Sequence, residues 1–259
     1  MAQLAAMTAN APTAAVLLIG DEILSGRTKD KNLGFIADYL TVLGIDLKEA
    51  RVVADIEAEI IVALNTLRAR YTYVFTTGGI GPTHDDITAD AVAKAFGVPI
   101  DHHPEAVEIL LAHFKAIGRE PNEARMRMAR TPKGATLIAN PVSKAPGFQI
   151  GNVFVMAGIP KVMNAMMEEV APRLERGAPV LSQTITIQGG EGDVAKPLKD
   201  IQERSHEVII GSYPFESPQG FATNLVLRSR DQSALATAMN EVRQMAVELT
   251  RSGKVRGWS

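Results

Sequence analysis

The sequence predicts an α/β protein, a three-layer α/β/α sandwich with a mainly parallel sheet, followed by a small α+β module. The first observation is that apolar runs suited to buried strands alternate with amphipathic helical patterns before residue 177. The second is that polar, glycine-containing loops follow these runs, as at the ligand-binding edge of open α/β sheets. The third is the order β-α-β-β-α after residue 182, which is typical of antiparallel strand pairing.

The first domain is predicted over residues 13–177. Its first strand, 14–19, reads AAVLLI, a continuous apolar run that suits a central strand covered on both faces. A polar loop over 20–32 leads into a helix over 31–43, in which apolar residues recur at helical spacing until Gly44. The further predicted elements are a strand over 47–53, a helix over 56–67, a strand from Tyr71, a helix from about Thr88, helices over 104–117 and 122–130, short strands over 136–140, 147–150 and 153–157, and a helix from Gly158 to about Arg176.

The second domain is predicted over residues 182–259, after a linker over 177–181 that contains a proline. It contains no obvious cluster of acids, bases or nucleophiles, so a structural or dimerisation role is favoured. Residues 1–12 are alanine-rich and lack the basic start and apolar centre of a secretory signal, which indicates a disordered leader. The predicted elements of the second domain are strands over 184–188, 208–213 and 223–228 and helices over 193–204 and 232–251.

The composition narrows the classes of function. The 259 residues contain no cysteine, which excludes disulfides, thiolate metal sites and a cysteine nucleophile. The net charge of −2 gives no support to a nucleic-acid or acidic-membrane partner. No stretch reaches the roughly 20 apolar residues of a membrane span. A cytoplasmic enzyme or binding protein for a small molecule fits best.

The most informative segment is the glycine-acid loop, residues 78–86, which reads GGIGPTHDD and follows a β-branched and aromatic run. Its glycines lack a Cβ, so the backbone can approach a phosphate or a planar ring closely. Asp85 and Asp86 can hold a metal ion or position a water molecule. The alternative is that the glycines only turn the chain and that Asp86 or Thr88 caps the next helix. The combination of glycines, a proline and an acidic pair between a strand and a helix favours phosphate chemistry.

Two further loops reach the same predicted edge of the sheet. Asp21 and Glu22 follow the first strand, and with the nearby hydroxyls they can bind ribose or pterin groups, or a metal on a diphosphate. Asp30 and Asn32 either share this role or cap the next helix. Asp55 follows the second strand, so acidic residues from three loops are expected to converge at the carboxyl ends of the strands.

Two basic positions have alternative interpretations. His84 lies inside the glycine-acid loop, where it donates to a phosphate, transfers a proton, or merely packs. Gly158 and Pro160 begin the last helix of the domain, whose N-terminus can hold an anion. Lys161 in its first turn opposes the helix dipole, which indicates either a bound negative group or an ordinary solvated lysine.

These motifs together resemble the molybdopterin-binding MoaB/Mog-like domain, and more closely its CinA-type branch and the domain fused to eukaryotic FAD synthases. Residues 184–259 look like the small module that follows this domain in CinA-type proteins. The resembling blocks are GDEILSGRTKDKN at 20–32, TTGGIGPTHDDITAD at 76–90, NPVSKAPGF at 140–148 and GIPKVM at 158–163.

The resemblance implies a pterin- or nucleotide-binding edge of the sheet and a homo-oligomer, either a dimer or a trimer. Asp55 and Asp86 match the positions of two essential aspartates of molybdopterin adenylyltransferases, but Ile80 stands where those enzymes carry threonine. The CinA-type branch is associated with metal-dependent hydrolysis of ADP-ribose or FAD-like dinucleotides. Full CinA proteins carry a further deamidase domain, and because this chain ends earlier, no nicotinamide-mononucleotide deamidase activity is expected.

The expected activity is therefore hydrolysis of a nucleotide diphosphate such as ADP-ribose or FAD with Mg²⁺ or Co²⁺. The alternatives are molybdopterin adenylylation, molybdopterin binding without turnover, and an inactive oligomerisation scaffold. The predicted catalytic residues are Asp55 and Asp86, and the predicted metal ligands are Asp85 and Asp86. The predicted ligand-binding residues are Gly20, Asp21, Glu22, Ser25, Gly26, Thr28, Thr77, Gly78, Gly79, Gly81, Pro82, Thr83, His84, Gly158, Pro160 and Lys161.

Overall fold

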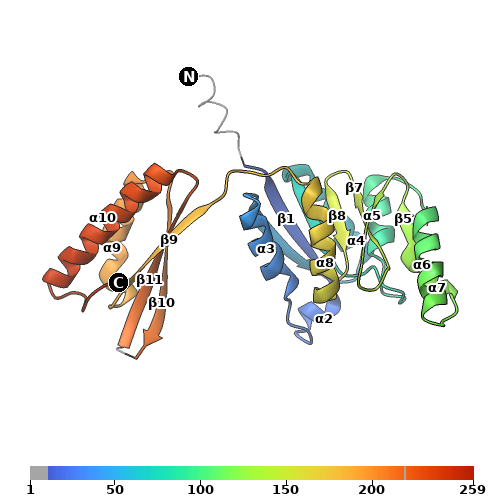
Figure 1. Cartoon of the computed structure of the whole chain (residues 1–259), viewed down its shortest axis with the longest axis horizontal. Coiled ribbons are helices and arrows are strands. Elements are labelled where there is room, and N and C mark those ends of the chain that lie inside the picture. The colour runs from blue at the N-terminus through green and yellow to red at the C-terminus, as the bar shows by residue number, and fades with distance from the viewer. Residues whose placement is uncertain (1–10, 219) are drawn as a thin grey trace, which may run out of the picture. The chain divides into compact units, whose positions relative to one another are not determined.

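The computed structural model describes residues 11–218 and 220–259. The predicted leader over 1–12 therefore lies outside the described residues, except for its last two positions. The chain divides into two compact units, an N-terminal unit that ends at Gly177 and a C-terminal unit that begins at Ala178 (Figure 1).

A six-stranded sheet forms the centre of the N-terminal unit, with the strand order β2-β1-β3-β8-β7-β6. β1 pairs in parallel with β2 and β3, and β3 pairs in parallel with β8. β7 runs antiparallel to both β8 and β6. The prediction of a mainly parallel sheet is confirmed. The strands are β1 (Thr13–Ile19), β2 (Asp46–Val53), β3 (Tyr73–Thr77), β6 (Thr136–Ile138), β7 (Gly147–Ile150) and β8 (Val153–Met156).

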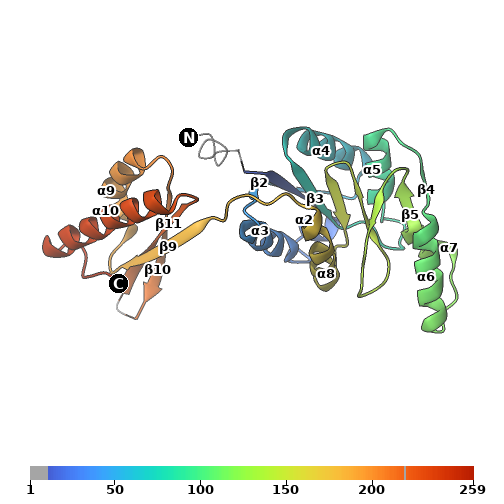
Figure 2. The ribbon, with the colours of Figure 1, turned by 45° about the horizontal axis from the view of Figure 1, so that its top comes forward.

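Helices cover both faces of this sheet (Figures 1 and 2). Val16 of β1 packs on the face covered by α3 and α8, whereas Leu17 packs on the face covered by α4 and α5. Because successive side chains of a strand point to opposite faces, a strand covered on both sides must be apolar throughout. This explains the run AAVLLI and confirms the three-layer sandwich. The helices are α3 (Asn32–Val42), α4 (Glu57–Arg70), α5 (Thr88–Phe96) and α8 (Pro160–Val170).

Residues 100–132, the outer segment, form a separate small layer beside the sheet, drawn in green in Figure 1. The predicted continuous helix over 122–130 is wrong, because its last residue already belongs to β5, which pairs antiparallel with β4. Only one short helical turn and a 3₁₀ turn remain. The elements are β4 (Ile100–His102), α6 (Pro104–Ala116), α7 (Glu123–Met126), a 3₁₀ turn (Arg127–Ala129) and β5 (Arg130–Pro132).

Two other predictions needed correction. The polar segment over 20–32 is not all loop, because it contains the short helix α2 (Asp21–Leu24). The last helix of the domain ends at Val170 instead of continuing to about Arg176, and a 3₁₀ turn (Ala171–Arg173) follows it. Pro172 lies in this turn and lacks the N–H that an α-helical bond would need.

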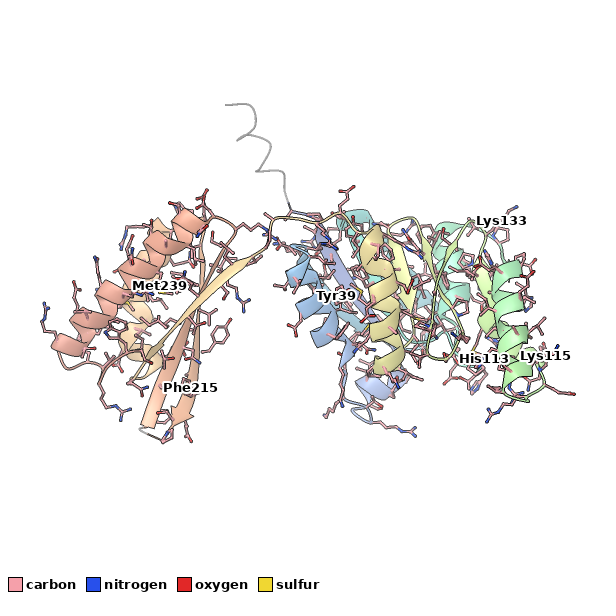
Figure 3. The ribbon with its side chains drawn as sticks, in the orientation of Figure 1. Tyr39, His113, Lys115, Lys133, Phe215 and Met239 are labelled. Atoms are coloured by element: carbon pink, nitrogen blue, oxygen red, sulfur yellow. The ribbon has the colours of Figure 1, made fainter. Side chains whose placement is uncertain are left out.

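The C-terminal unit is a three-stranded antiparallel sheet, in the order β10-β11-β9, with two helices packed against it. Met239 of α10 is almost fully buried between that helix and the sheet (Figure 3). This confirms the small α+β module. Leu181, predicted as linker, is the first residue of β9. The elements are β9 (Leu181–Ile187), α9 (Glu191–Arg204), β10 (Ile209–Ser217), β11 (Gly220–Ser229) and α10 (Gln232–Arg251).

Within the described residues, 11–218 and 220–259, no helix is both long and apolar enough to cross a membrane.

Candidate functional site

The glycine-acid loop leaves the carboxyl end of β3, and its first two residues need to be glycine. Gly78 and Gly79 have φ values of 104° and 66°, in the region that side chains rarely adopt. A Cβ on Gly78 would lie 2.1 Å from the carbonyl oxygen of Ile19, and one on Gly79 would lie 2.1 Å from Thr88 Oγ1. Thr88 Oγ1 also donates to the carbonyl oxygen of Gly78 at 3.0 Å. The loop is therefore packed tightly against β1 and the start of α5.

Asp86 holds the glycine-acid loop in shape. Its carboxylate accepts hydrogen bonds from the backbone N–H groups of Gly81 at 2.6 Å and Thr83 at 2.8 Å, and from the Thr83 hydroxyl at 2.5 Å. The N-cap residue of α5 is Ile87, and no side chain among the described residues caps this helix. The structure therefore contradicts the alternative that Asp86 or Thr88 caps this helix. Because a carboxylate has about four acceptor positions, one position on Asp86 remains open.

A cavity of about 460 Å³ opens beside this loop, at the edge of the sheet where β3 and β8 end. Its volume suits a small-molecule ligand. Backbone of the glycine-acid loop forms one side, and the start of α8 forms another. The predicted site residues that line it are Glu22, Thr28, Gly78, Gly79, Gly81, Pro82, Asp86, Gly158 and Pro160.

The other predicted site residues lie outside the lining of this cavity. The His84 side chain is 97% exposed, and its Nδ1 lies 3.9 Å from the Asp85 carboxylate. Lys161 is exposed on the first turn of α8. Ser25 Oγ donates to the backbone of Glu22. The full set outside the lining is Gly20, Asp21, Ser25, Gly26, Asp55, Thr77, Thr83, His84, Asp85 and Lys161.

Acidic side chains gather next to the cavity. Asp55 Oδ2 accepts a hydrogen bond from the backbone N–H of Asp21 at 3.0 Å. Burial raises the pKa of Asp55 above its usual value, although the Asp21 N–H opposes this shift. The negative charges of Asp21, Glu22 and Asp85 raise the pKa of Asp55 further. The acidic residues after β1 and β2 are thus in contact, and the glycine-acid loop adds the charge of Asp85.

The oxygen donors of these carboxylates suit a hard divalent cation such as Mg²⁺. Within residues 11–218 and 220–259, however, no group of three or more acidic, histidine or cysteine side chains is placed to hold an ion. Mg²⁺ commonly uses one or two carboxylates and takes its other ligands from substrate phosphates and water. The carboxylates present can supply one or two such ligands.

Asn32 ties two sides of the site together, and the sequence did not single it out for this. The side chain is 4% exposed, and Nδ2 donates to the carbonyl oxygen of Gly158 at 2.8 Å. Its Oδ1 has no hydrogen-bond partner within the described part of the chain. Asp30, which precedes the N-cap residue Lys31, accepts from the backbone N–H groups of Asn32 and Leu33 at the start of α3. The sequence left open whether Asp30 and Asn32 bind a ligand or cap α3, and the structure gives the two residues different roles.

The loop over 140–146 is a second part of the site that was missed. β7 runs antiparallel to β8, so the start of β7 lies at the edge where β8 ends. Asn140 shapes the loop: Oδ1 accepts from the N–H groups of Val142 and Ser143 at 3.0 Å, and Nδ2 donates to Ala145 at 2.8 Å. The only signal in the sequence was the block NPVSKAPGF. Lining residues that were not predicted are Ile80, Met128, Asn140, Ser143, Ala145, Ala157, Ile159 and Val162.

The fold and the site define an α/β protein with a cavity at the carboxyl ends of parallel strands, where open α/β sheets commonly bind ligands. The chain belongs to the family described as the probable molybdopterin binding domain, whose model matches residues 15–176. Residues 179–250 match the model described as the middle domain of FAD synthase.

Relatives place the chain in the CinA-type branch. A protein of Pyrobaculum calidifontis is 35% identical over 212 residues, which cover 78% of this chain and 81% of the relative. A CinA-like protein of Citrifermentans bemidjiense is 37% identical over 245 residues, which cover 89% of this chain but 57% of the relative. The crystal structure of the protein CinA from Thermoplasma acidophilum, described as of unknown function, is similar with a TM-score of 0.59 and 33% identity, covering 64% of this chain and 99% of that one.

Proposed function

We propose that this protein binds a pterin- or adenine-containing diphosphate in the cavity and hydrolyses a nucleotide diphosphate such as ADP-ribose or FAD with a divalent metal ion. The observation that carries the proposal is the position of the cavity. It lies between the backbone of the glycine-acid loop and the N-terminal end of α8, with acidic side chains beside it.

The two sides of the cavity support binding of a molecule with a phosphate and a ring. Helix α8 has 11 residues, and the partial positive charge at its N-terminus favours an anion. Gly78 and Gly79 line the cavity with backbone alone, and their positive φ values fit the tight turn of the loop. Ile159, Val162 and Met128 offer apolar surface for a flat ring.

The acidic residues support the hydrolytic step. Asp85 and the open acceptor position of Asp86 would hold the ion, which would polarise a phosphoryl oxygen when bound. Asp55 would accept a proton from the attacking water, because its raised pKa makes it a stronger base than an ordinary aspartate. The water oxygen forms a bond to phosphorus, and the bond from that phosphorus to the bridging oxygen breaks. From ADP-ribose the products are AMP and ribose 5-phosphate.

The experiment measures AMP release from ADP-ribose and from FAD with Mg²⁺, with Co²⁺ and with EDTA. Asp86→Ala is a poor test because it frees two backbone N–H groups and disturbs the loop itself. Asp55→Asn and Asp85→Asn are the informative variants, and Asp38→Asn, an exposed aspartate on α3, is the matched control. We expect metal-dependent AMP release that falls about 100-fold or more in the two variants and is unchanged in the control.

If the wild type binds ADP-ribose or FAD but releases no AMP, hydrolysis is wrong. Molybdopterin binding without turnover, or adenylylation, then becomes the better function. Incubation with molybdopterin and ATP separates these two outcomes, because only an adenylyltransferase forms an adenylylated product and pyrophosphate.

We also propose a cytoplasmic homo-oligomer, a dimer or a trimer, that acts on a small molecule and not on nucleic acid. The absence of cysteine is compatible with a reducing compartment, and the net charge of −2 does not suit a polyanionic partner. Val52 on the edge strand β2 and Val62 on α4 are exposed apolar side chains, which supports an interface there. Light scattering tests the oligomer, and a monomer at every concentration would contradict it.

A further inference from the structure

A phosphate bound in the cavity would lie close to negatively charged side chains. Its lining includes the carboxylates of Glu22 and Asp86, and no lysine or arginine of the described part of the chain lines it. Two negative groups beside a phosphate are unfavourable unless a positive charge lies close by. A basic side chain behind the wall of the cavity can supply that charge.

Arg127 lies behind this wall, on the 3₁₀ turn of the outer segment. It lines a small space of about 20 Å³ that shares Gly79, Gly81 and Asp86 with the main cavity. Its Nη2 donates to the carbonyl oxygen of Asp86 at 3.2 Å. The side chain is half-buried, and within residues 11–218 and 220–259 no carboxylate lies close enough to form an ion pair with it. Arg127 therefore brings a positive charge to the back of the glycine-acid loop.

Two neighbouring arginines do not offer a comparable charge to the loop. Arg130 forms a bidentate ion pair with Asp90, with N···O distances of 2.6 and 3.1 Å, so its charge is neutralised locally. Arg125 lies over the ring of Phe114, at 5.5 Å from its centroid, and lines neither the cavity nor the small space. Arg125 is thus a matched residue in the same segment that lacks contact with the loop.

We propose that Arg127 is a positioning residue that makes the glycine-acid loop able to bind an anion. It holds the backbone of Asp86 and supplies a positive charge that offsets the two carboxylates in the lining. The ligand selected in this way is a nucleoside or pterin that carries phosphate, and the uncharged nucleoside gains nothing from Arg127. This inference rests on the proposed binding of a diphosphate but does not require hydrolysis.

The experiment compares the affinities of ADP and adenosine by calorimetry, with EDTA and with Mg²⁺. The variants are Arg127→Met, Arg127→Lys and the control Arg125→Met, each checked for folding by circular dichroism. Because hydrogen bonds and charges of this kind contribute substantially to phosphate binding, we expect Arg127→Met to weaken ADP binding about tenfold or more in EDTA. Adenosine binding should not change. Arg127→Lys should restore most of the affinity for ADP, and Arg125→Met should resemble the wild type.

Two results would overturn the inference alone. The first is unchanged ADP affinity in Arg127→Met, and the second is an equal loss for ADP and adenosine, which would mean that Arg127 only supports the fold. A wild-type protein that binds neither ADP nor molybdopterin, which is titrated in the same way, would instead overturn the proposed function, and the inference with it. The two failures are therefore distinguishable in the same set of titrations.

Discussion

Asn32 Nδ2 donates to the carbonyl oxygen of Gly158 at 2.8 Å and joins two segments that lie 126 residues apart in the sequence. The same Nδ2 lies 3.4 Å from Thr77 Oγ1 at the end of β3. The start of α3, the end of β3 and the loop before α8 are thus fixed relative to one another by one buried amide. Gly78, which follows β3, and Gly158, which precedes α8, both line the cavity, so the amide stabilises the fold and the site together.

Replacing Asn32 by alanine is expected to destabilise the protein by about 1–3 kcal/mol, because the carbonyl oxygen of Gly158 then loses its donor. Urea unfolding of the wild type and the variant measures this difference. We also expect weaker ADP binding, since the start of α8 is no longer held. If stability falls while ADP affinity is unchanged, Asn32 supports the fold but not the site.

The second prediction concerns Gly79 and uses Gly97 as its control, because both have φ of 66°. Gly97→Ala meets no atom within 4 Å, so only the left-handed backbone opposes it, at about 1–2 kcal/mol. Gly79→Ala carries the same backbone cost, and in addition its Cβ would lie 2.1 Å from Thr88 Oγ1. We expect a larger fall of the melting temperature for Gly79→Ala, together with loss of ADP binding that Gly97→Ala does not cause. Equal melting temperatures would contradict the tight packing of the loop.

The third prediction is a pH dependence that arises from Glu49 and Tyr71, far from the cavity lining. The Tyr71 hydroxyl donates to Glu49 Oε2 at 2.6 Å. This hydrogen bond, followed by that from Arg51, lowers the pKa of Glu49, and the hydrogen bond to Glu49 also raises the pKa of Tyr71. The stability contributed by Glu49 is present above pH 4.5 and is lost as the pH falls through its lowered value. The contribution of Tyr71 is present below pH 10.0 and is lost as the pH rises through its raised value.

Tyr71→Phe removes this hydroxyl and keeps the ring that packs in the core. The difference in unfolding free energy between wild type and variant should therefore be largest at neutral pH and should shrink at both extremes. Urea unfolding at a series of pH values tests this. A difference that does not vary with pH would contradict the link between this hydrogen bond and the ionisation of Glu49 and Tyr71.

Local patterns in the sequence predicted the strands and helices of the three-layer sandwich. The run at 14–19 is apolar on both faces because helices cover both faces of the sheet. This local pattern therefore predicts the three layers directly. The turn to the glycine-acid loop was also visible, because glycines at positive φ are a local requirement.

The parts that were missed depend on contacts between distant segments. The strand β5 exists because Arg130 to Pro132 pair with β4, and no local pattern indicates this pairing, so the predicted helix was extended to Arg130. Asn140 belongs to the site only because β7 reverses direction beside β8. The predicted roles of Asp85 and Asp86 stay predictions. The structure adds that Asp86 shapes its own loop, because its carboxylate accepts hydrogen bonds from the backbone N–H groups of Gly81 and Thr83.

The reversal of β7 also has an evolutionary consequence. The glycine-acid loop follows β3, whereas the loop over 140–146 precedes β7, and the two loops reach one cavity from separate stretches of the chain. Each loop is shaped by its own internal hydrogen bonds, from Asp86 in one and Asn140 in the other. Substitutions that alter one loop therefore leave the internal bonds of the other in place. Such an arrangement lets a lineage vary one wall of the cavity while the other wall is inherited unchanged.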